Sequence, residues 1–487
     1  MIVVKINEAQ FEYDIHSLIK AFYPGVEVKV LGWDTEAQSE EGMPEFEVEF
    51  QRSGISFCIK EKEKRVEGYA AYRKPDDRAE VKNDLKLLIY EKLSVFLQKE
   101  LPWGTLTGIR PTKIPMTLLS EPDSAYDEEG ILKFMQEKYA VSEEKGRLSI
   151  EIAKREKALL SKLHYKDGYS LYIGIPFCPT TCLYCSFTSF PIGAWKDKVD
   201  DYLNALEKEI DAVVKMMDGK ILDTVYIGGG TPTTLSPEEL DRLLTKLKTA
   251  FGFSTVQEFT VEAGRADSIT REKLQVLYEH GVTRISVNPQ TMREETLKLI
   301  GRKATAAQTV EVYQLAREVG FSNINMDIIL GLPGEGAADV SYTIKEIAKL
   351  VPDSLTVHSL AVKRASKLSK WIQENGIELL HNTEETMEIA AKGAKNMGMV
   401  PYYLYRQKNM SGNFENVGYA AEGKFGIYNI LMMEEVQSIV ALGAGSISKR
   451  LFDGGRIERC ENVKEVSQYI ERIGEMIERK KVLFGSI

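Results

Sequence analysis

The amino-acid sequence predicts an α/β fold: a partial TIM-like barrel of six strand–helix units, with an N-terminal α+β domain and a mostly helical C-terminal extension. From about residue 168, short apolar runs alternate with longer amphipathic runs, which is typical of parallel strands joined by helices. Before that point the apolar residues recur with period two, which indicates half-buried strands. Chemically reactive residue types follow the ends of the predicted barrel strands, where barrel enzymes carry their sites. We therefore divide the chain into residues 1–165, 166–375 and 376–487.

The composition and charge exclude several kinds of protein. Hydrophobic residues make up 43% of the 487 residues and charged residues 28%, which is typical of a soluble globular protein with two or three cores. No apolar run approaches the roughly 20 residues that span a bilayer, and residues 1–5 resemble a strand instead of a signal peptide. We therefore expect a cytoplasmic protein without a membrane span. The formal net charge of −9 argues against a nucleic-acid partner.

The strands and helices follow from the periodicity. In the first region we expect strands at 2–6, 26–30, 46–50 and 55–59 and helices at 81–99 and 142–163. The barrel strands are predicted at 171–175, 223–227, 258–262, 284–287, 323–329 and 354–358. The helices between them are predicted at 199–217, 237–250, 268–280, 306–319 and 340–350. In the third region we expect helices at 383–397 and 463–480.

Three of the five cysteines stand together after the first barrel strand. Cys178, Cys182 and Cys185 are separated by three residues and then by two, on a loop that Pro176 starts. This spacing lets three thiolates converge on an iron–sulfur centre with one metal position open for chemistry. A structural zinc site would need a fourth ligand, and no His or Cys follows before His280. A redox dithiol would leave Cys178 without a role.

Further polar residues follow the other barrel strands. Residues 228–233 read Gly-Gly-Gly-Thr-Pro-Thr, a turn whose amide groups could face a ligand, although it lacks the P-loop lysine and the dinucleotide-binding spacing. Asp327 interrupts an apolar strand, which is costly unless the carboxylate is paired or binds a ligand. Glu262, Gln290 and Arg302 also lie at or just beyond strand ends, and for each a solvated or ion-paired side chain is the alternative.

Taken together, these motifs resemble radical S-adenosylmethionine (SAM) enzymes, and within them the oxygen-independent coproporphyrinogen III dehydrogenase family, in its HemZ-like branch. The motifs that carry the resemblance are Tyr-x-x-Ile-Pro-Phe-Cys, Gly-Gly-Gly-Thr-Pro-Thr, Arg-Ile-Ser…Gln and Asp-Ile-Ile…Gly-Leu-Pro-Gly, between about residues 170 and 450. The resemblance implies a radical SAM barrel, with a [4Fe-4S] cluster on the three cysteines and one SAM molecule, or two. It implies that the nucleotide contacts Tyr172, Tyr184, Gly229, Gly230, Thr231, Glu262, Gln290, Arg302 and Asp327, and that Ala361 and Ile447 belong to the site of a second nucleotide.

The sequence departs from the well-characterised branch of this family at two positions. Gly174 stands where that branch has His, and Phe187 stands where it has a fourth Cys. Phe187 also occurs in a sister branch that binds haem as a chaperone. In the third region, Tyr402, Tyr403, Tyr405, Arg406 and Lys408 form an aromatic and basic cluster that would suit a flat tetrapyrrole edged with carboxylates, or would form one face of a core strand.

The resemblance implies a radical enzyme of haem biosynthesis. It would convert two propionates of coproporphyrinogen III to vinyl groups, giving protoporphyrinogen IX, and would draw electrons from a donor such as flavodoxin or ferredoxin. The alternatives are a haem-binding chaperone, a radical enzyme that modifies haem, and a zinc-stabilised barrel that binds nucleic acid.

Overall fold

The computed structural model describes residues 1–108, 110–121, 126–164, 167–187, 189–363, 366–407 and 414–485. The chain forms two compact units. Unit 1 comprises Met1–Lys154 and Tyr405–Glu415, and unit 2 comprises Arg155–Leu404 and Asn416–Ile487. The division into three regions stays a prediction.

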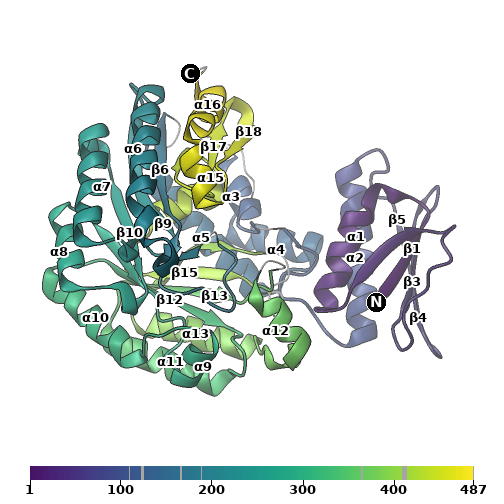
Figure 1. Ribbon diagram of the computed structural model, residues 1–487. Coiled ribbons are helices and arrows are strands. Elements are labelled where there is room, and N and C mark those ends of the chain that lie inside the picture. Colours follow the sequence, from purple (N-terminus) through teal and green to yellow (C-terminus); the bar gives the residue numbers. More distant parts are fainter. Residues whose placement is uncertain are drawn as a thin grey trace. The chain divides into compact units, whose positions relative to one another are not determined.

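Unit 1 contains a five-stranded sheet in the order β2-β1-β3-β4-β5 (Figure 1). Its strands are β1 (Ile2–Ile6), β2 (Val28–Gly32), β3 (Glu45–Phe50), β4 (Gly54–Glu61) and β5 (Lys64–Ala71). The helices α1 (Glu12–Phe22) and α2 (Arg78–Leu97) bury apolar side chains against the strands in one core. The helices α3 (Lys113–Ser120), α4 (Glu128–Tyr139) and α5 (Glu143–Leu160) follow, with the unit boundary inside α5.

A buried ion pair explains why residues 405–415 belong to unit 1. Glu415 accepts a 2.7 Å hydrogen bond from Nε1 of Trp103 and pairs with Nζ of Lys145 at 2.9 Å. All three side chains are buried, so the carboxylate is stabilised by two donors where water is absent.

Unit 2 contains the six predicted parallel strands, in the order β13-β12-β11-β10-β9-β6 within a larger sheet. They are β6 (Gly168–Ile175), β9 (Ile221–Gly229), β10 (Glu258–Gly264), β11 (Arg284–Val287), β12 (Ile324–Leu330) and β13 (Ser354–Ser359). The helices between them are α6 (Val199–Met216), α7 (Pro237–Ala250), α8 (Arg271–Glu279), α9 (Glu294–Leu299), α10 (Ala306–Val319) and α11 (Ala337–Leu350). Figure 1 shows most of these helices around the outside of the strands, which confirms the predicted α/β class.

The C-terminal part extends both ends of this sheet. β14 (Val400–Tyr405) and β15 (Asn416–Ala420) continue it beyond β13, where β15 is antiparallel. β16 (Ser438–Leu442), β17 (Ile447–Leu451) and β18 (Ile457–Glu461) continue it beyond β6. The intervening helices are α12 (Lys367–Asn375), α13 (Glu384–Asn396), α14 (Ile427–Glu434), α15 (Val466–Glu471) and α16 (Ile473–Phe484). The sequence pattern indicates helices here and, as one alternative, a core strand around Tyr402, but not that five strands join the sheet.

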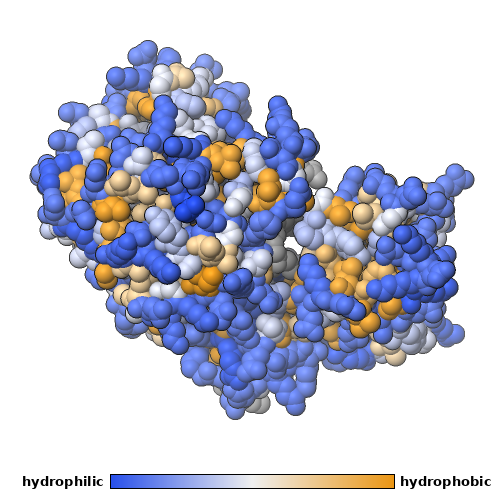
Figure 2. All heavy atoms as spheres, turned by 90° about the horizontal axis from the view of Figure 1, so that it is seen from below, coloured by the Kyte–Doolittle hydropathy of each residue, from blue (hydrophilic) through white to orange (hydrophobic). Residues whose placement is uncertain are grey.

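Among the described residues, no helix is both long and apolar enough to cross a bilayer. On the face shown in Figure 2, apolar residues occur as separate patches among polar ones.

Candidate functional site

The three-cysteine loop begins where β6 ends. Pro176 follows Ile175, and the short strand β7 (Phe177–Cys178) pairs with β8 (Phe190–Pro191) to close the loop. The glycine turn after β9 lies directly against it, because the Gly230 amide donates to the Ile175 carbonyl and the Thr231 amide to the Phe177 carbonyl, each at 2.7 Å. Parallel pairing of β6 with β9 thus brings the two most distinctive motifs together.

The thiols lie in a buried, mutually interacting group. Burial raises the pKa of the Cys178 thiol to about 11, and the neighbouring Cys185 and Cys182 add to the rise. Burial also raises the pKa of Cys185. The Cys178 sulfur lies 3.4 Å from Oγ1 of Thr231. Such thiols stay protonated at neutral pH unless a cation binds them, and a bound metal would stabilise their thiolates.

Two arginines flank Cys182. Nη1 of Arg265 lies 3.8 Å from the Cys182 sulfur, and the same nitrogen holds both oxygens of Thr180 in the loop. The Arg302 guanidinium also hydrogen-bonds Cys182 and donates at 3.2 Å to the hydroxyl of Tyr184. Arg265 is also ion-paired with Asp267 at 2.7 Å, whereas no carboxylate among the described residues pairs with Arg302. The guanidinium groups beside the cysteines, and the unpaired Arg302 above all, suit an anionic iron–sulfur cluster.

No group of three or more His, Cys, Asp or Glu side chains in the described ranges could hold a single metal ion. A [4Fe-4S] cluster makes a different demand, since each cysteine binds its own iron and the thiols need not meet at one atom. The donor set of three soft thiolates with two arginines therefore fits a cluster.

The glycine turn is built for close packing. Gly229 has φ +106°, a conformation that favours glycine, and its amide hydrogen-bonds the Glu262 carboxylate. A Cβ on Gly230 would stand 2.4 Å from the Phe177 carbonyl oxygen. The amides of Gly229, Gly230 and Thr231 thus donate hydrogen bonds to other groups of the protein. This contradicts the expectation that they face a ligand. Carbonyl oxygens are the groups that the turn could offer instead.

One face of the parallel sheet carries polar side chains. Strand register places them on the same face from β6 to β13, and we call this set the polar face. It consists of Tyr172, Tyr226, Thr260, Glu262, Arg284, Ser286, Asn325, Asp327, Thr356 and His358. An enclosed barrel without a ligand usually fills this face with branched apolar side chains. The polar face therefore offers hydrogen-bond partners where a barrel without a ligand would be apolar.

Glu262 and Asp327 differ in their ionisation. Burial raises the pKa of Glu262 to about 7, although a 2.5 Å hydrogen bond from the Tyr226 hydroxyl opposes the rise. Burial also acts on Asp327, but His358, 3.9 Å away, and the Asn325 amide, which donates at 2.6 Å, hold the pKa of Asp327 below its ordinary value. The pKa of Glu262 thus lies near neutral pH, whereas Asp327 is ionised at that pH.

Several buried polar atoms on and beside this face have no hydrogen-bond partner among the described residues. They are Thr260 Oγ1, Arg284 Nε, Ser286 Oγ, Asn288 Oδ1, Gln290 Oε1 and Arg302 Nε. Gln290 also has φ +68°, a strained conformation for a residue other than glycine. Unsatisfied buried groups are costly, and a bound polar ligand would satisfy them.

The remaining predicted residues divide between the site and its surroundings. Tyr172 stacks against Tyr226 at 6.1 Å between ring centroids. Tyr184 packs against an apolar cluster that includes Leu360 and Val362, so the intervening Ala361 lies beside the cysteine loop. Ile447 begins β17, two strands beyond β6, and its side chain is 43% exposed. The structure brings the other predicted residues together but does not place Ile447 on the polar face.

The aromatic and basic cluster of the third region mostly belongs to cores. Tyr402 and Tyr403 are buried, and Tyr402 stacks against Phe425 at 5.3 Å. Arg406 is buried in unit 1 over the Trp103 ring and donates to the Leu106 carbonyl. Lys408 lies outside the described residues. These contacts favour the core-strand interpretation for Tyr402 and Tyr403.

Sequence reasoning missed Tyr226 and Tyr428. Tyr428, on α14, stacks on Tyr226 at 4.5 Å and thereby extends the aromatic stack that begins at Tyr172. The strand alternation that places Gly228 on the polar face could have identified Tyr226, two residues earlier. No local signal could have identified Tyr428, because its position depends on a helix from a distant part of the chain.

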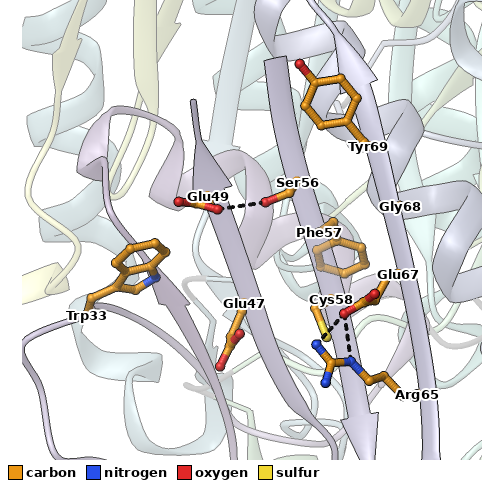
Figure 3. Close-up of a pocket in the computed structure, with 10 residues that line it drawn as sticks. All are labelled: Trp33, Glu47, Glu49, Ser56, Phe57, Cys58, Arg65, Glu67, Gly68 and Tyr69. Carbon is orange, nitrogen blue, oxygen red and sulfur yellow. Dashed lines mark hydrogen bonds and ion pairs between the residues drawn. The ribbon is translucent and has the colours of Figure 1, made fainter. Parts of the chain in front are cut away.

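Unit 1 contains a separate hollow of about 510 Å³ on the sheet surface (Figure 3). Trp33 and Tyr69 stand at its edges, and the glutamates Glu47, Glu49 and Glu67 line it. Glu67 is already bonded to Arg65, and Glu49 to Ser56. The hollow holds no unsatisfied buried group among the described residues, in contrast to the polar face of unit 2.

Comparisons with known proteins agree with this geometry. The model of the Radical SAM superfamily matches residues 172–347. The oxygen-independent coproporphyrinogen-III oxidase-like protein HemZ of Bacillus subtilis (strain 168) is 42% identical over 407 residues, covering 82% of this chain and 80% of HemZ. The heme chaperone HemW of the same strain is 32% identical over 309 residues, covering 63% of this chain and 76% of HemW.

Among solved structures, coproporphyrinogen III oxidase (HemN) from Escherichia coli, a radical SAM enzyme, superposes with a TM-score of 0.52 at 23% identity. The match covers 66% of this chain and 73% of HemN and shows a shared fold. Proteins of this superfamily use a [4Fe-4S] cluster with SAM, and the cysteine loop and polar face provide residues that fit both. The predicted family is thus confirmed: the chain belongs to the radical SAM superfamily and, within it, to the oxygen-independent coproporphyrinogen III oxidase family in its HemZ-like branch.

Proposed function

We propose that the protein is an oxygen-independent coproporphyrinogen III dehydrogenase of haem biosynthesis, acting in the cytoplasm. In this reaction each of two propionates loses a hydrogen atom, carbon dioxide and one electron, which passes to a one-electron acceptor, and a vinyl group remains. When bound, the reduced cluster and SAM supply the 5′-deoxyadenosyl radical that takes the hydrogen atom. The observation that carries the proposal is the row of unsatisfied buried polar atoms beside a three-cysteine loop.

The chain's own residues would hold the two groups. Cys178, Cys182 and Cys185 would bind the cluster, and Arg302 would balance part of its negative charge. Arg265, which is paired with Asp267, would hold the loop in place. Glu262, Gln290 and Asp327 would bind the polar parts of SAM. The buried Gln290 Oε1 has no hydrogen-bond partner among the described residues, and the two carboxylates can accept further bonds from an ammonium group or a ribose hydroxyl.

The aromatic stack joins Tyr172 and Tyr226 of the polar face to Tyr428 of α14. Together with the apolar packing around Tyr184, it would limit access of water to the reacting atoms.

The test is turnover under anaerobic conditions. The protein is reconstituted with iron and sulfide and incubated with coproporphyrinogen III, SAM, dithionite and an electron acceptor. We expect carbon dioxide and 5′-deoxyadenosine to accumulate together, with protoporphyrinogen IX as product, and neither to form with the Cys182→Ala variant. Formation of deoxyadenosine without carbon dioxide would show that the substrate is a different molecule.

A haem chaperone is the second candidate, because the chain is 32% identical to HemW and Phe187 leaves no fourth cysteine in the loop. This function predicts one haem bound per chain and no carbon dioxide. A haem titration followed by absorbance, run beside the turnover assay, separates the two functions.

A further inference from the structure

Three exposed lysines surround the cysteine loop although the whole chain carries a net charge of −9. They are Lys298 near the end of α9, Lys303 after it, and Lys367 at the start of α12. Among the described residues none of them has a carboxylate within 4.0 Å. Of the acidic side chains close to them in sequence, Glu295 pairs with Arg293 and Glu374 with Lys370, whereas Glu294 accepts the neutral Ala306 amide and keeps its negative charge. Arg293 also pairs with Asp339. Even with these carboxylates counted, the lysines and their neighbours leave a small local excess of positive charge.

Backbone hydrogen bonds hold the segments that carry these lysines against the cysteine loop. The Leu183 amide donates to the Ile300 carbonyl at 3.0 Å, and the Thr180 hydroxyl donates to the Gly301 carbonyl at 3.0 Å. The Leu368 amide donates to the Leu183 carbonyl at 2.9 Å. Each lysine is thus one or two residues from a group bonded to the loop between Thr180 and Leu183.

Two exposed apolar side chains belong to the same segments, one in the cysteine loop and one beside Lys298. Phe187 is 75% exposed, and its backbone amide hydrogen-bonds the Cys185 sulfur. Leu299, beside Lys298, is 44% exposed. Exposed apolar groups edged by charges of one sign are typical of a docking surface for a protein of the opposite charge.

We infer that Lys298, Lys303, Lys367, Phe187 and Leu299 form the docking surface for an acidic one-electron carrier protein. We call this set the carrier surface. The net charge of the chain repels an acidic protein elsewhere, so the local lysines would steer it to the cysteine loop. The inference rests on the proposed function, which requires one electron at the cluster for each radical formed. The reduced carrier, a flavin or iron–sulfur protein, loses that electron and the cluster gains it.

The test compares two triple variants of the reconstituted protein. The first replaces Lys298, Lys303 and Lys367 by Glu. The matched control replaces Lys208, Lys215 and Lys220, which are also exposed, by Glu. The last turn of α6 contains Lys215, and Lys220 precedes β9, so these two lie at the end of the strands opposite the cysteine loop. Both variants change the net charge equally.

The binding of an acidic flavodoxin is measured by titration, and deoxyadenosine formation is measured with dithionite as a small reductant. We expect the carrier-surface variant to bind flavodoxin about tenfold more weakly or worse, with its dithionite-driven activity within about twofold of the unchanged protein. We expect the control variant to bind like the unchanged protein, whose binding weakens as salt is added.

The inference would be overturned if flavodoxin binding weakened equally in both triple variants, or if it weakened in neither. If the carrier-surface triple variant unfolds, the single Lys303→Glu variant repeats the test. If the unchanged protein forms no carbon dioxide with dithionite, the proposed function fails, while the binding titration still decides whether the carrier surface exists.

Discussion

The hydroxyl of Tyr226 on β9 donates a 2.5 Å hydrogen bond to Oε1 of Glu262 on the neighbouring strand β10. The bond stabilises the ionised carboxylate, whereas burial disfavours it, and burial prevails, so the pKa of Glu262 rises to about 7. The pKa of this carboxyl group beside the glycine turn thus lies near neutral pH, which is costly for folding but useful for binding a cationic or hydroxyl-bearing ligand.

The first prediction concerns the pH dependence of stability. Between pH 4.5, the ordinary pKa, and about 7, the unfolded chain releases the Glu262 proton while the folded protein keeps it, so stability falls as pH rises through this window. Gln cannot ionise, so the Glu262→Gln variant and the unchanged protein should have the same unfolding free energy near pH 4.5. Above about pH 7 the unfolding free energy of the variant should be higher, by at most about 3 kcal/mol. Urea unfolding of the ligand-free protein at both ends of the window measures the difference.

The same substitution should weaken SAM binding, because the carboxylate is lost where we place the ligand. Glu279→Gln, on the exposed surface of α8, serves as the control and should change neither property. A Glu262→Gln protein that is less stable above neutral pH would contradict this assignment.

The second prediction concerns the glycine turn. Gly230→Ala would place a Cβ 2.4 Å from the Phe177 carbonyl oxygen, and backbone must move to relieve it. We expect a loss of about 2 kcal/mol in stability and a reduced yield of reconstituted cluster, because the displaced carbonyl leads directly into Cys178. Gly252→Ala is the matched control, since a Cβ there meets nothing within 4 Å. Thermal unfolding measures the loss of stability, and the iron content measures the yield of cluster. Equal stability and equal iron content in the two variants would contradict the prediction.

The third prediction concerns a buried ion pair in unit 2. Nζ of Lys480 on α16 lies 2.6 Å from Oε1 of Glu209 on α6, and both side chains are fully buried. Glu209 also accepts bonds from the Tyr469 hydroxyl and the Gly443 amide. Lys480→Met leaves this carboxylate without its cation and should cost about 3 to 5 kcal/mol in urea unfolding.

Lys481→Met, which removes a surface pair with Glu478, should cost less than about 1 kcal/mol. Replacing both Glu209 and Lys480 by Met should recover part of the loss, because no unpaired charge is then buried. A double variant less stable than Lys480→Met alone would argue against the ion pair as the cause.

Much of the sheet could be predicted from the sequence because its signal is local. Runs such as 258–262 and 284–287 are short and alternate between polar and apolar residues, and β10 and β11 begin where expected. The strands β16 and β17 were missed because their pairing with β6 and with each other depends on partners far along the chain.

Residues of the candidate site could be proposed from motifs, but their contacts could not. Cys178, Gly230 and Thr231 could be assigned from motifs, whereas the engagement of the glycine-turn amides required the structure. Arg265 comes three residues after the strand predicted at 258–262, but no pattern in the sequence shows that it reaches Cys182. Side-chain contacts between elements distant in sequence are set by tertiary packing, which periodicity does not encode.

The most direct test of the account is the iron content and the EPR spectrum of the anaerobically reconstituted, reduced protein, with and without SAM. We predict about four irons per chain and a [4Fe-4S] signal that changes when SAM is added, as expected for a cluster held by three cysteines with one iron open. Cys182→Ala should abolish the signal, while Cys460→Ala, on β18 far along the chain, should leave it unchanged. A signal that survives Cys182→Ala, or one that SAM leaves unaltered, would contradict the account.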